Sequence, residues 1–303
     1  MKKDFLAISE LSKDDIFEIF DLAKKLKQKQ KSGEAHRYLD GKALAMIFQK
    51  PSARTRVSFE VGMFQLGGHA LYLGPNDIQI GKRESTGDVA QTLSRYVDII
   101  MARMFGHEDV VELAEHATVP VVNGLTDLLH PCQVMADLFT VFEKKPHSND
   151  LKISYIGDGN NMANSWINMA SKISMNLALA IPKGYDPDES ILQNAQQANV
   201  SEIQIFREPA QAVKNTDVIY TDVWASMGQE SEAEERKIAF KNYQVNDDLV
   251  THAKPDCLVM HCLPAHRGDE ITDEVVDGPN SIVFDEAENR LHVQKAIMVK
   301  LLE

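Results

Sequence analysis

The sequence of 303 residues has few cysteines and no long apolar run. Its three cysteines, an odd and small number for this length, argue against a disulfide framework and favour a reducing compartment. No segment reaches the about 18 consecutive apolar residues that a membrane-spanning helix needs. The segment Met1–Leu6 turns acidic at Asp4 before any apolar stretch develops, unlike a secretory signal. We therefore expect a cytoplasmic protein without a membrane segment.

Basic side chains are scarce relative to acidic ones. The chain has 32 Lys and Arg against 45 Asp and Glu, which gives a formal charge of −13. A surface with this charge repels phosphate backbones and anionic lipids, so no general binding to nucleic acid or membranes is expected. Hydrophobic residues make up 44% and charged residues 25%, which is typical of a folded globular protein.

Short apolar runs alternate with helical stretches along the chain. A first amphipathic helix follows a capping box at residues 12–15, with apolar residues at helical spacing from Ile16 to Leu26. The predicted strands are 43–48, 70–73, 97–101, 119–122, 152–156, 177–181, 203–206, 218–223 and 258–262. This alternation is typical of βαβ units in parallel sheets.

The length and a break in the pattern predict two domains. At about 150 residues per domain, 303 residues suit two, and the polar segment 144–150 has the composition of a surface connection. We predict an α/β fold of two doubly wound parallel-sheet domains, spanning 1–145 and 146–286. A last helix, from about 287 to 303, is predicted to pack back on the N-terminal domain.

The strand at 43–48 leads into a turn and a helix that suit an anion. Residues 52–56 read Ser-Ala-Arg-Thr-Arg, and a helix beginning there directs backbone N–H groups and the positive end of its dipole at one point. Because the planar arginine fork suits phosphate, Ser52, Arg54 and Thr55 are candidate ligands. The alternative is that Ser52 only caps the helix and the arginines pair on the surface.

Two further strand ends in this half carry Arg103 and His130. Ligands of open α/β sheets collect at the carboxyl ends of the strands, so both side chains are expected near the anion site. Each is a weak signal alone, because a histidine before proline is often a loop or capping residue.

In the second half, Gly157 to Asn161 begin like a dinucleotide fingerprint. Met162 stands where the third glycine belongs, and no acidic residue follows about twenty positions later, which excludes that interpretation. A helix N-terminus with amide side chains remains, suited to a carboxylate. The alternative is simple capping by Asn160 or Asn161.

Asp222 follows another predicted strand, where its carboxylate could bind an amino group. A cluster near the last strand invites a zinc interpretation. Its members are Cys257, His261, Cys262 and His266. No C-x2-C pair is present and the residues span a predicted strand, so we expect no metal.

Taken together, these segments resemble the ornithine carbamoyltransferases, within the aspartate/ornithine carbamoyltransferase family, over essentially the whole chain. Four ordered motifs carry the resemblance: S-x-R-T-R at 52–56, H-P-x-Q at 130–133, D-x-x-x-S-M-G at 222–228 and H-C-L-P at 261–264. Ala53 departs from the family pattern, in which many relatives carry a hydroxyl there, but its backbone N–H remains.

The resemblance implies two substrate sites. Residues that would bind carbamoyl phosphate are Ser52, Ala53, Arg54, Thr55, Gln79, Arg103, His130, Gln133, Cys262, Leu263 and Arg290. Residues that would bind ornithine are Asn161, Asp222, Ser226, Met227 and Cys262. The catalytic residues would be Arg54, Arg103, His130 and Cys262. Gln79 matches a loop that reaches the site of a neighbouring subunit, which implies a homotrimer or a multiple of trimers.

The implied reaction transfers the carbamoyl group from carbamoyl phosphate to the δ-amine of L-ornithine, giving L-citrulline and phosphate, as in arginine biosynthesis. It needs no cofactor. An aspartate acceptor would call for cationic groups and a diamine would need no carboxylate site, so the turn at 226–228 favours ornithine. The alternatives are a putrescine carbamoyltransferase and a non-catalytic protein that binds a small molecule.

Overall fold

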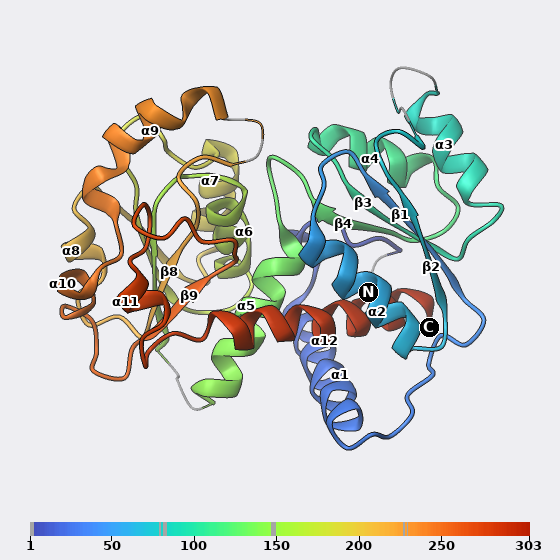
Figure 1. Cartoon of the computed structure of the whole chain (residues 1–303), viewed down its shortest axis with the longest axis horizontal. Helices are drawn as coiled ribbons and strands as arrows, with labels where there is room; N and C mark the ends of the chain where they lie inside the picture. The colour runs from blue at the N-terminus through green and yellow to red at the C-terminus, as the bar shows by residue number, and fades with distance from the viewer. Residues whose placement is uncertain (1–2, 79, 81–83, 147–149, 227, 229) are drawn as a thin grey trace. The chain divides into compact units, whose positions relative to one another are not determined.

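The computed structural model describes residues 3–78, 80, 84–146, 150–226, 228 and 230–303. The chain forms two compact units, unit 1 of Met1–Phe139 with Glu288–Glu303, and unit 2 of Thr140–Ala287 (Figure 1). Each has a parallel sheet between helices, so the predicted fold class is confirmed. None of the helices in the described residues combines the length with the apolar character of a bilayer span.

The sheet of unit 1 has four strands in the order β2-β1-β3-β4. They are β1 (Ala43–Phe48), β2 (His69–Leu73), β3 (Ile99–Arg103) and β4 (Val121–Leu125). The first strand has its predicted limits, whereas β4 begins two residues later than predicted. The reason is Pro120, which has no N–H group to contribute to a sheet ladder.

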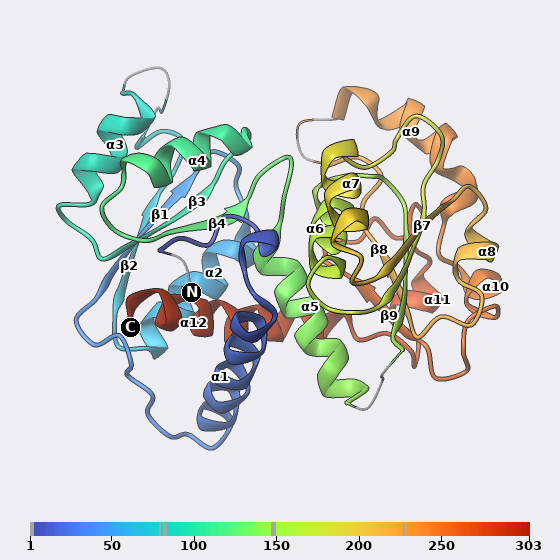
Figure 2. The same cartoon turned by 180° about the vertical axis from the view of Figure 1, so that it is seen from behind.

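Helices cover both faces of this sheet (Figures 1 and 2). They are η1 (Ile8–Glu10), α1 (Lys13–Lys31), α2 (Ala53–Gln65), α3 (Thr86–Leu93), α4 (His107–His116), the first part of α5 (Pro131–Lys144) and most of α12 (Val283–Leu302). The capping box of α1 is confirmed, because the Ser12 Oγ accepts the Asp15 N–H at 3.1 Å and Asp15 Oδ2 accepts the Ser12 N–H at 3.0 Å.

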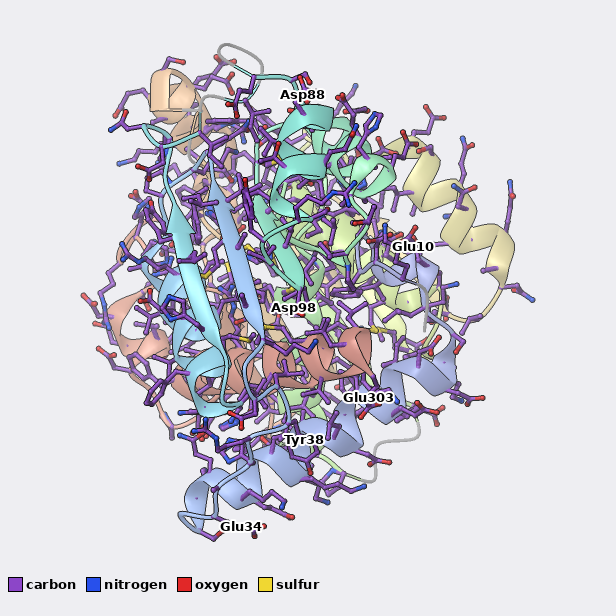
Figure 3. The ribbon with its side chains drawn as sticks, turned by 90° about the vertical axis from the view of Figure 1, so that its right-hand side faces the viewer. Glu10, Glu34, Tyr38, Asp88, Asp98 and Glu303 are labelled. Atoms are coloured by element: carbon purple, nitrogen blue, oxygen red, sulfur yellow. The ribbon has the colours of Figure 1, made fainter. Side chains whose placement is uncertain are left out.

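The helices α3 and α4 pack on one face, in an apolar cluster with residues of β1 and β3. The helices α1, α2 and α12 lie on the other face (Figures 1 and 2). The C-terminal helix begins at Val283, earlier than predicted, with Asp285 and Glu286 in a first turn that favours acidic groups. Figure 3 shows Glu303, near its other end, beside α1, where Lys300 pairs with Glu18 at 2.9 Å.

The sheet of unit 2 has five strands in the order β7-β6-β5-β8-β9. They are β5 (Lys152–Ile156), β6 (Asn176–Ala180), β7 (Glu202–Phe206), β8 (Val218–Thr221) and β9 (Leu258–His261). Its helices are α6 (Asn161–Ala170), α7 (Glu189–Ala198), α8 (Pro209–Ala212), η2 (Glu230–Glu232), α9 (Ala233–Phe240), η3 (Lys241–Tyr243), α10 (Asp247–Val250) and α11 (Asp273–Val276). Trp166 of α6 packs against Tyr220 on one face, at 5.6 Å between ring centroids. Phe240 of α9 belongs to the core on the other face.

The strand orders determine where ligands can bind. In a doubly wound sheet, the crevice opens at the carboxyl ends of the two strands between which the order reverses. In unit 1 these strands are β1 and β3, and in unit 2 they are β5 and β8. The segments after these strands carry Ser52, Arg103, Gly157 and Asp222 at or just beyond the strand ends.

Candidate active site

The N-terminus of α2 lies at the strand-end edge of unit 1. Ser52 is its N-cap, since the Ser52 Oγ accepts the Thr55 N–H at 3.3 Å. Ala53 is the first helical residue, so its N–H belongs to the group of amides at the positive end of the helix. Arg56 turns away, pairing with Glu60 at 3.2 Å. Ser52 thus caps the helix, which does not exclude a contact with an anion, and Arg56 pairs at the surface.

Three arginines act electrostatically on a buried histidine at this edge. Burial holds the pKa of His130 well below its usual range, and the positive charges of Arg290, Arg103 and Arg54 lower it further. Arg290 Nη2 also donates to the Thr55 Oγ1 at 3.1 Å. Since these side chains come from α2, β3, α12 and the start of α5, the tertiary structure gathers cations around a neutral imidazole, an arrangement suited to an anion.

Of two further residues expected to bind carbamoyl phosphate, Gln133 and Gln79, the structure describes only Gln133. Gln133 is buried on α5, where its Nε2 donates to Asp137 Oδ1 at 2.7 Å and its backbone N–H donates to the His130 carbonyl. It therefore lies one turn from the imidazole. Gln79 lies outside the described residues.

In unit 2, the carboxylate of Asp222 is buried just after β8. Asp222 Oδ2 accepts Asn160 Nδ2 at 2.8 Å, and Asp222 Oδ1 is 3.0 Å from Cys262 Sγ, which follows β9. The fold thus brings together two residues expected at the acceptor site. Asn161 and Ser226 are partly buried near the ends of β5 and β8, and Met227 is not among the described residues.

Asn160 is a residue that the sequence analysis did not place in the site. Its Oδ1 caps α6 by accepting the Met162 N–H at 2.9 Å and also accepts the Tyr155 hydroxyl at 3.1 Å. These contacts orient the amide so that its Nδ2 points at Asp222. The sequence shows two adjacent asparagines, Asn160 and Asn161, but it does not indicate which of them contacts the carboxylate of Asp222.

A buried pair holds the H-C-L-P segment in place. His261 Nδ1 accepts the Leu263 N–H at 2.8 Å, so the other ring nitrogen carries the proton and donates to Glu270 Oε1 at 3.0 Å. Leu263 has a φ of 57°, in the left-handed region, and precedes a cis peptide bond to Pro264. The pair thus stabilises an uncommon backbone conformation beside Cys262. Glu270 was not recognised in the sequence.

The ligand atoms of Asp222, His261 and Cys262 lie within 4.8 Å of one another, close enough to hold a metal ion. The imidazole does not suit that role here, because its Nδ1 lone pair accepts the Leu263 N–H and its Nε2–H faces Glu270. Cys257 is buried, which raises its thiol pKa to about 12, and it is not a member of this group. The zinc pattern read from the sequence therefore does not form one set of ligands.

A buried ion pair joins Arg236 to Asp158 in unit 2. Arg236 Nη1 of α9 is 2.8 Å from Asp158 Oδ2 and 3.0 Å from the Trp224 carbonyl oxygen. Burial raises the pKa of Asp158 to about 6, although the guanidinium opposes the shift. The pair links α9 to the segment after β5 and to the segment that follows Asp222.

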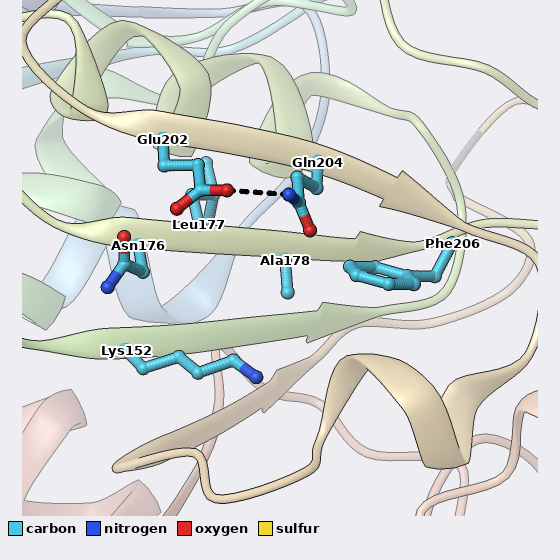
Figure 4. A pocket seen from close by; sticks show the side chains of 7 residues that line it. All are labelled: Lys152, Asn176, Leu177, Ala178, Glu202, Gln204 and Phe206. Carbon is cyan, nitrogen blue, oxygen red and sulfur yellow. Dashed lines mark hydrogen bonds between the residues drawn. The ribbon is translucent and has the colours of Figure 1, made fainter.

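A pocket on the sheet face of unit 2 is separate from these residues (Figure 4). It is lined by Lys152, Asn176, Leu177, Ala178, Glu202, Gln204 and Phe206. Lys152, Asn176 and Glu202 are the first residues of their strands, so the pocket extends toward the end of the sheet opposite Asp222. The expected site residues that the structure describes do not line it.

Comparisons with known proteins match both halves of the chain. Residues 3–143 match the family model described as the carbamoyl-P binding domain of aspartate/ornithine carbamoyltransferase, and residues 149–301 match its Asp/Orn binding domain. The chain is 54% identical to an ornithine carbamoyltransferase of Geobacter metallireducens, covering 100% of both. It is 54% identical to an anabolic ornithine carbamoyltransferase of Pyrococcus furiosus, covering 99% of this chain and 96% of that one.

Solved structures give the same result. An ornithine carbamoyltransferase structure from Pyrococcus furiosus superposes with a TM-score of 0.93 at 55% identity, covering 97% of this chain and 95% of that one. An anabolic ornithine carbamoyltransferase from Campylobacter jejuni gives 0.94 at 37% identity, covering 99% of each. With both family domains matched in order along its length, this chain belongs to the aspartate/ornithine carbamoyltransferase family.

Proposed function

We propose that this protein transfers the carbamoyl group of carbamoyl phosphate to the δ-amine of L-ornithine, giving L-citrulline and phosphate. The observation that carries the proposal is the gathering of Arg54, Arg103 and Arg290 around neutral His130 at the N-terminus of α2. The ornithine carbamoyltransferase names of the relatives support ornithine as the acceptor. Two relatives are named anabolic, which supports the direction of arginine synthesis.

We assign carbamoyl phosphate to residues 1–145 together with the C-terminal helix from about 287. The amides at the start of α2, with Ser52, Ala53, Thr55 and the three arginines, hold the phosphate. Neutral His130 and Gln133 hydrogen-bond the carbamoyl end. Negative charge develops on the carbonyl oxygen and on the leaving phosphate during the reaction, and donors already aimed at these atoms stabilise the transition state.

We assign ornithine to residues 146–286. Asp222 accepts the α-ammonium group, while Asn161, Ser226 and Met227 contact the amino-acid end. Cys262 lies beside the reacting δ-amine, and Cys262 and Leu263 complete the carbamoyl site. Gln79 is proposed to reach the phosphate site of a neighbouring subunit. The carboxylate of Asp222 supports this assignment because it is held by Asn160 and lies 3.0 Å from the thiol of Cys262.

The protonation state of the acceptor limits the rate. An amine with a pKa of about 10.4 is neutral in only about 1 molecule in 2,500 at pH 7, a handicap of about 4–5 kcal/mol. A site that removes the amine from water lowers its pKa and reduces this handicap. Turnover at subsaturating ornithine is therefore expected to rise with pH above neutrality.

We further propose a homotrimer, or a multiple of trimers, in the cytoplasm. An apolar surface on unit 1 supports the assembly. Its residues are Val57, Val61 and Phe64, which share one face of α2. Phe64 is 76% exposed in the single chain. Light scattering should give three chain masses or a multiple, and Phe64→Asp should lower that mass.

Citrulline formation tests the activity. Ornithine, putrescine and aspartate are compared as acceptors, with carbamoyl phosphate as donor and a chelator present. Rapid turnover selective for ornithine is the expected result. Preference for putrescine would overturn the acceptor assignment but not the phosphate site. If no acceptor were carbamoylated, the protein would instead be a non-catalytic protein that binds a small molecule.

A further inference from the structure

Lys295 is a fully buried lysine on α12, and its hydrogen-bond partners in the described part of the chain include no carboxylate. Its Nζ lies 2.9 Å from Gln30 Oε1, 2.8 Å from Gln65 Oε1 and 3.1 Å from His36 Nε2. Taking an ammonium group out of water without a counter-ion is unfavourable, and such groups are uncommon unless paired. The side chain is therefore retained at the expense of stability, and its contacts suggest why.

The partners are arranged for the charged form of the amine. His36 Nδ1 lies 3.0 Å from the carbonyl oxygen of Glu34, just beyond the C-terminal end of α1 (Figure 3). A carbonyl oxygen can only accept, so Nδ1 carries the ring proton and Nε2 presents a lone pair to Lys295. The ammonium thus has three N–H donors and three acceptors.

The helix ends around Lys295 also favour a positive charge. Gln65 is the last residue of α2 and Gln30 the next to last of α1. The C-terminal ends of both helices, which carry partial negative charge, therefore lie near the ammonium group. This explains how a lysine without a carboxylate partner is tolerated in the interior.

The same side chain lies where α2 and α12 cross. A Cβ atom at Gly62 of α2 would be 3.2 Å from Lys295 Cγ and 3.4 Å from Leu291 Cδ1, so glycine lets the two helices approach closely without displacing these side chains. At the other end of α2, Thr55 accepts a hydrogen bond from Arg290, five residues before Lys295 on α12. The two helices are therefore joined at both ends of α2.

We propose that Lys295 is a positioning residue for the anion site of unit 1. Its ammonium group fixes α12 against the C-terminal end of α2 and so holds Arg290 and the α2 amides in one geometry. This inference rests on the proposed function, in that the anion is taken to be carbamoyl phosphate. If Lys295 loses its proton, the amine has two N–H donors in place of three, and the contact between α2 and α12 should loosen.

The surrounding charges bear on the pH dependence. Burial lowers the pKa of Lys295 to about 8. Two titratable groups interact with Lys295: His36, before β1, contacts its amine, and His292 of α12 is affected by its charge. His292 in turn interacts with Glu288 of α12 and Lys27 of α1, and α2 contributes the uncharged Gln65. His292 has a pKa lowered to about 4, first by burial and then by the charge of Lys295, so it stays neutral above pH 7. Glu288 pairs with Lys31 at 3.2 Å.

The test measures the dissociation constant of carbamoyl phosphate by calorimetry on the full chain without ornithine, from pH 7 to 9.5. Lys295→Met, which keeps the shape of the side chain, should bind at least about tenfold more weakly at pH 7, with little further change at higher pH. In the unsubstituted protein, the affinity for carbamoyl phosphate should fall in a one-proton step near pH 8. Gln65→Glu, which supplies a carboxylate, should move that step to higher pH.

Lys300→Met is the matched control, because Lys300 is on the same helix, carries the same charge and pairs at the surface with Glu18. It should bind as the unsubstituted protein does. The inference would be overturned if Lys295→Met bound carbamoyl phosphate at pH 7 as tightly as the unsubstituted protein does. It would also be overturned if the affinity of that variant still fell in a step near pH 8. Tight binding without citrulline formation would overturn only the proposed function. A protein that binds no carbamoyl phosphate would refute both.

Discussion

Replacing Lys295 by methionine should change how the stability of the protein depends on pH. In the folded chain, burial lowers the pKa of this lysine to about 8 from the ordinary 10.5. Between these values the unfolded chain binds more protons than the folded chain, so the unfolding free energy that this group contributes rises with pH. Below pH 8 its full destabilising effect is present, and above pH 10.5 the effect is gone.

The magnitude follows from the two pKa values. A shift from 10.5 to about 8 corresponds to about 3 kcal/mol, of which about 2.5 kcal/mol should be recovered between pH 7 and pH 10. Lys295→Met loses this term together with the three hydrogen bonds of the ammonium group. The difference in unfolding free energy, variant minus unsubstituted protein, should therefore fall by about 2.5 kcal/mol from pH 7 to pH 10.

Urea unfolding at a series of pH values measures this difference. Both tryptophans, Trp166 and Trp224, belong to unit 2, so far-ultraviolet circular dichroism or hydrogen exchange of α12 must report on unit 1. Lys300→Met again serves as the control, since hydrogen bonding to Glu18 raises the pKa of Lys300. If the curves for Lys295→Met and the unsubstituted protein run parallel between pH 7 and pH 10, the reasoning is refuted.

Four other substitutions test the two sites. Arg103→Ala removes a cation beside His130 and should reduce turnover by about 100-fold or more with the fold retained, as one lost oxyanion donor typically does; near-normal initial rates would exclude Arg103 from the reaction. Cys262→Ala should raise the KM for ornithine more than it weakens carbamoyl phosphate binding, and equal losses in calorimetry would move the thiol out of the acceptor site. Glu270→Gln removes the charged acceptor of the His261 Nε2–H, a bond worth about 1.5–3 kcal/mol, so turnover should fall about tenfold or more while unit 1 still binds carbamoyl phosphate. Gly159→Ala would place a Cβ 2.4 Å from backbone atoms of Tyr185 and Pro187 and should destabilise unit 2 by about 1–3 kcal/mol, measured by tryptophan fluorescence in urea; an unchanged midpoint would contradict the close packing.

Much of the local structure could be predicted from the sequence. The capping box at Ser12 and the strand at Ala43–Phe48 formed as expected, because a cap and an apolar run act within a few residues. The strand β4 begins later than the apolar run predicts, because Pro120 has no N–H group to contribute to the sheet. The start of the C-terminal helix at Val283, earlier than predicted, is likewise a shift at the end of an element.

The site was predicted less completely. Motifs identified Asp222 and Cys262, but Asn160 and Glu270 were missed because their roles depend on partners distant in sequence or in a later loop. Asn160 meets Asp222 across 62 residues, and nothing within the local pattern distinguishes it from Asn161. The roles of the expected substrate-binding residues remain predictions that the experiments above address.

The sequence by itself determined the alternation of strands and helices, the two-domain α/β class and the motifs that place polar groups at strand ends. These features follow from periodicity, capping and backbone sterics, which act over short stretches of chain. Only the tertiary structure decided that Arg290 meets Thr55 across 235 residues and that Lys295 meets Gln30 across 265. Contacts at such separations arise when the apolar faces of distant helices are buried against one sheet, and the cost of desolvating a charge then depends on which neighbours that burial supplies.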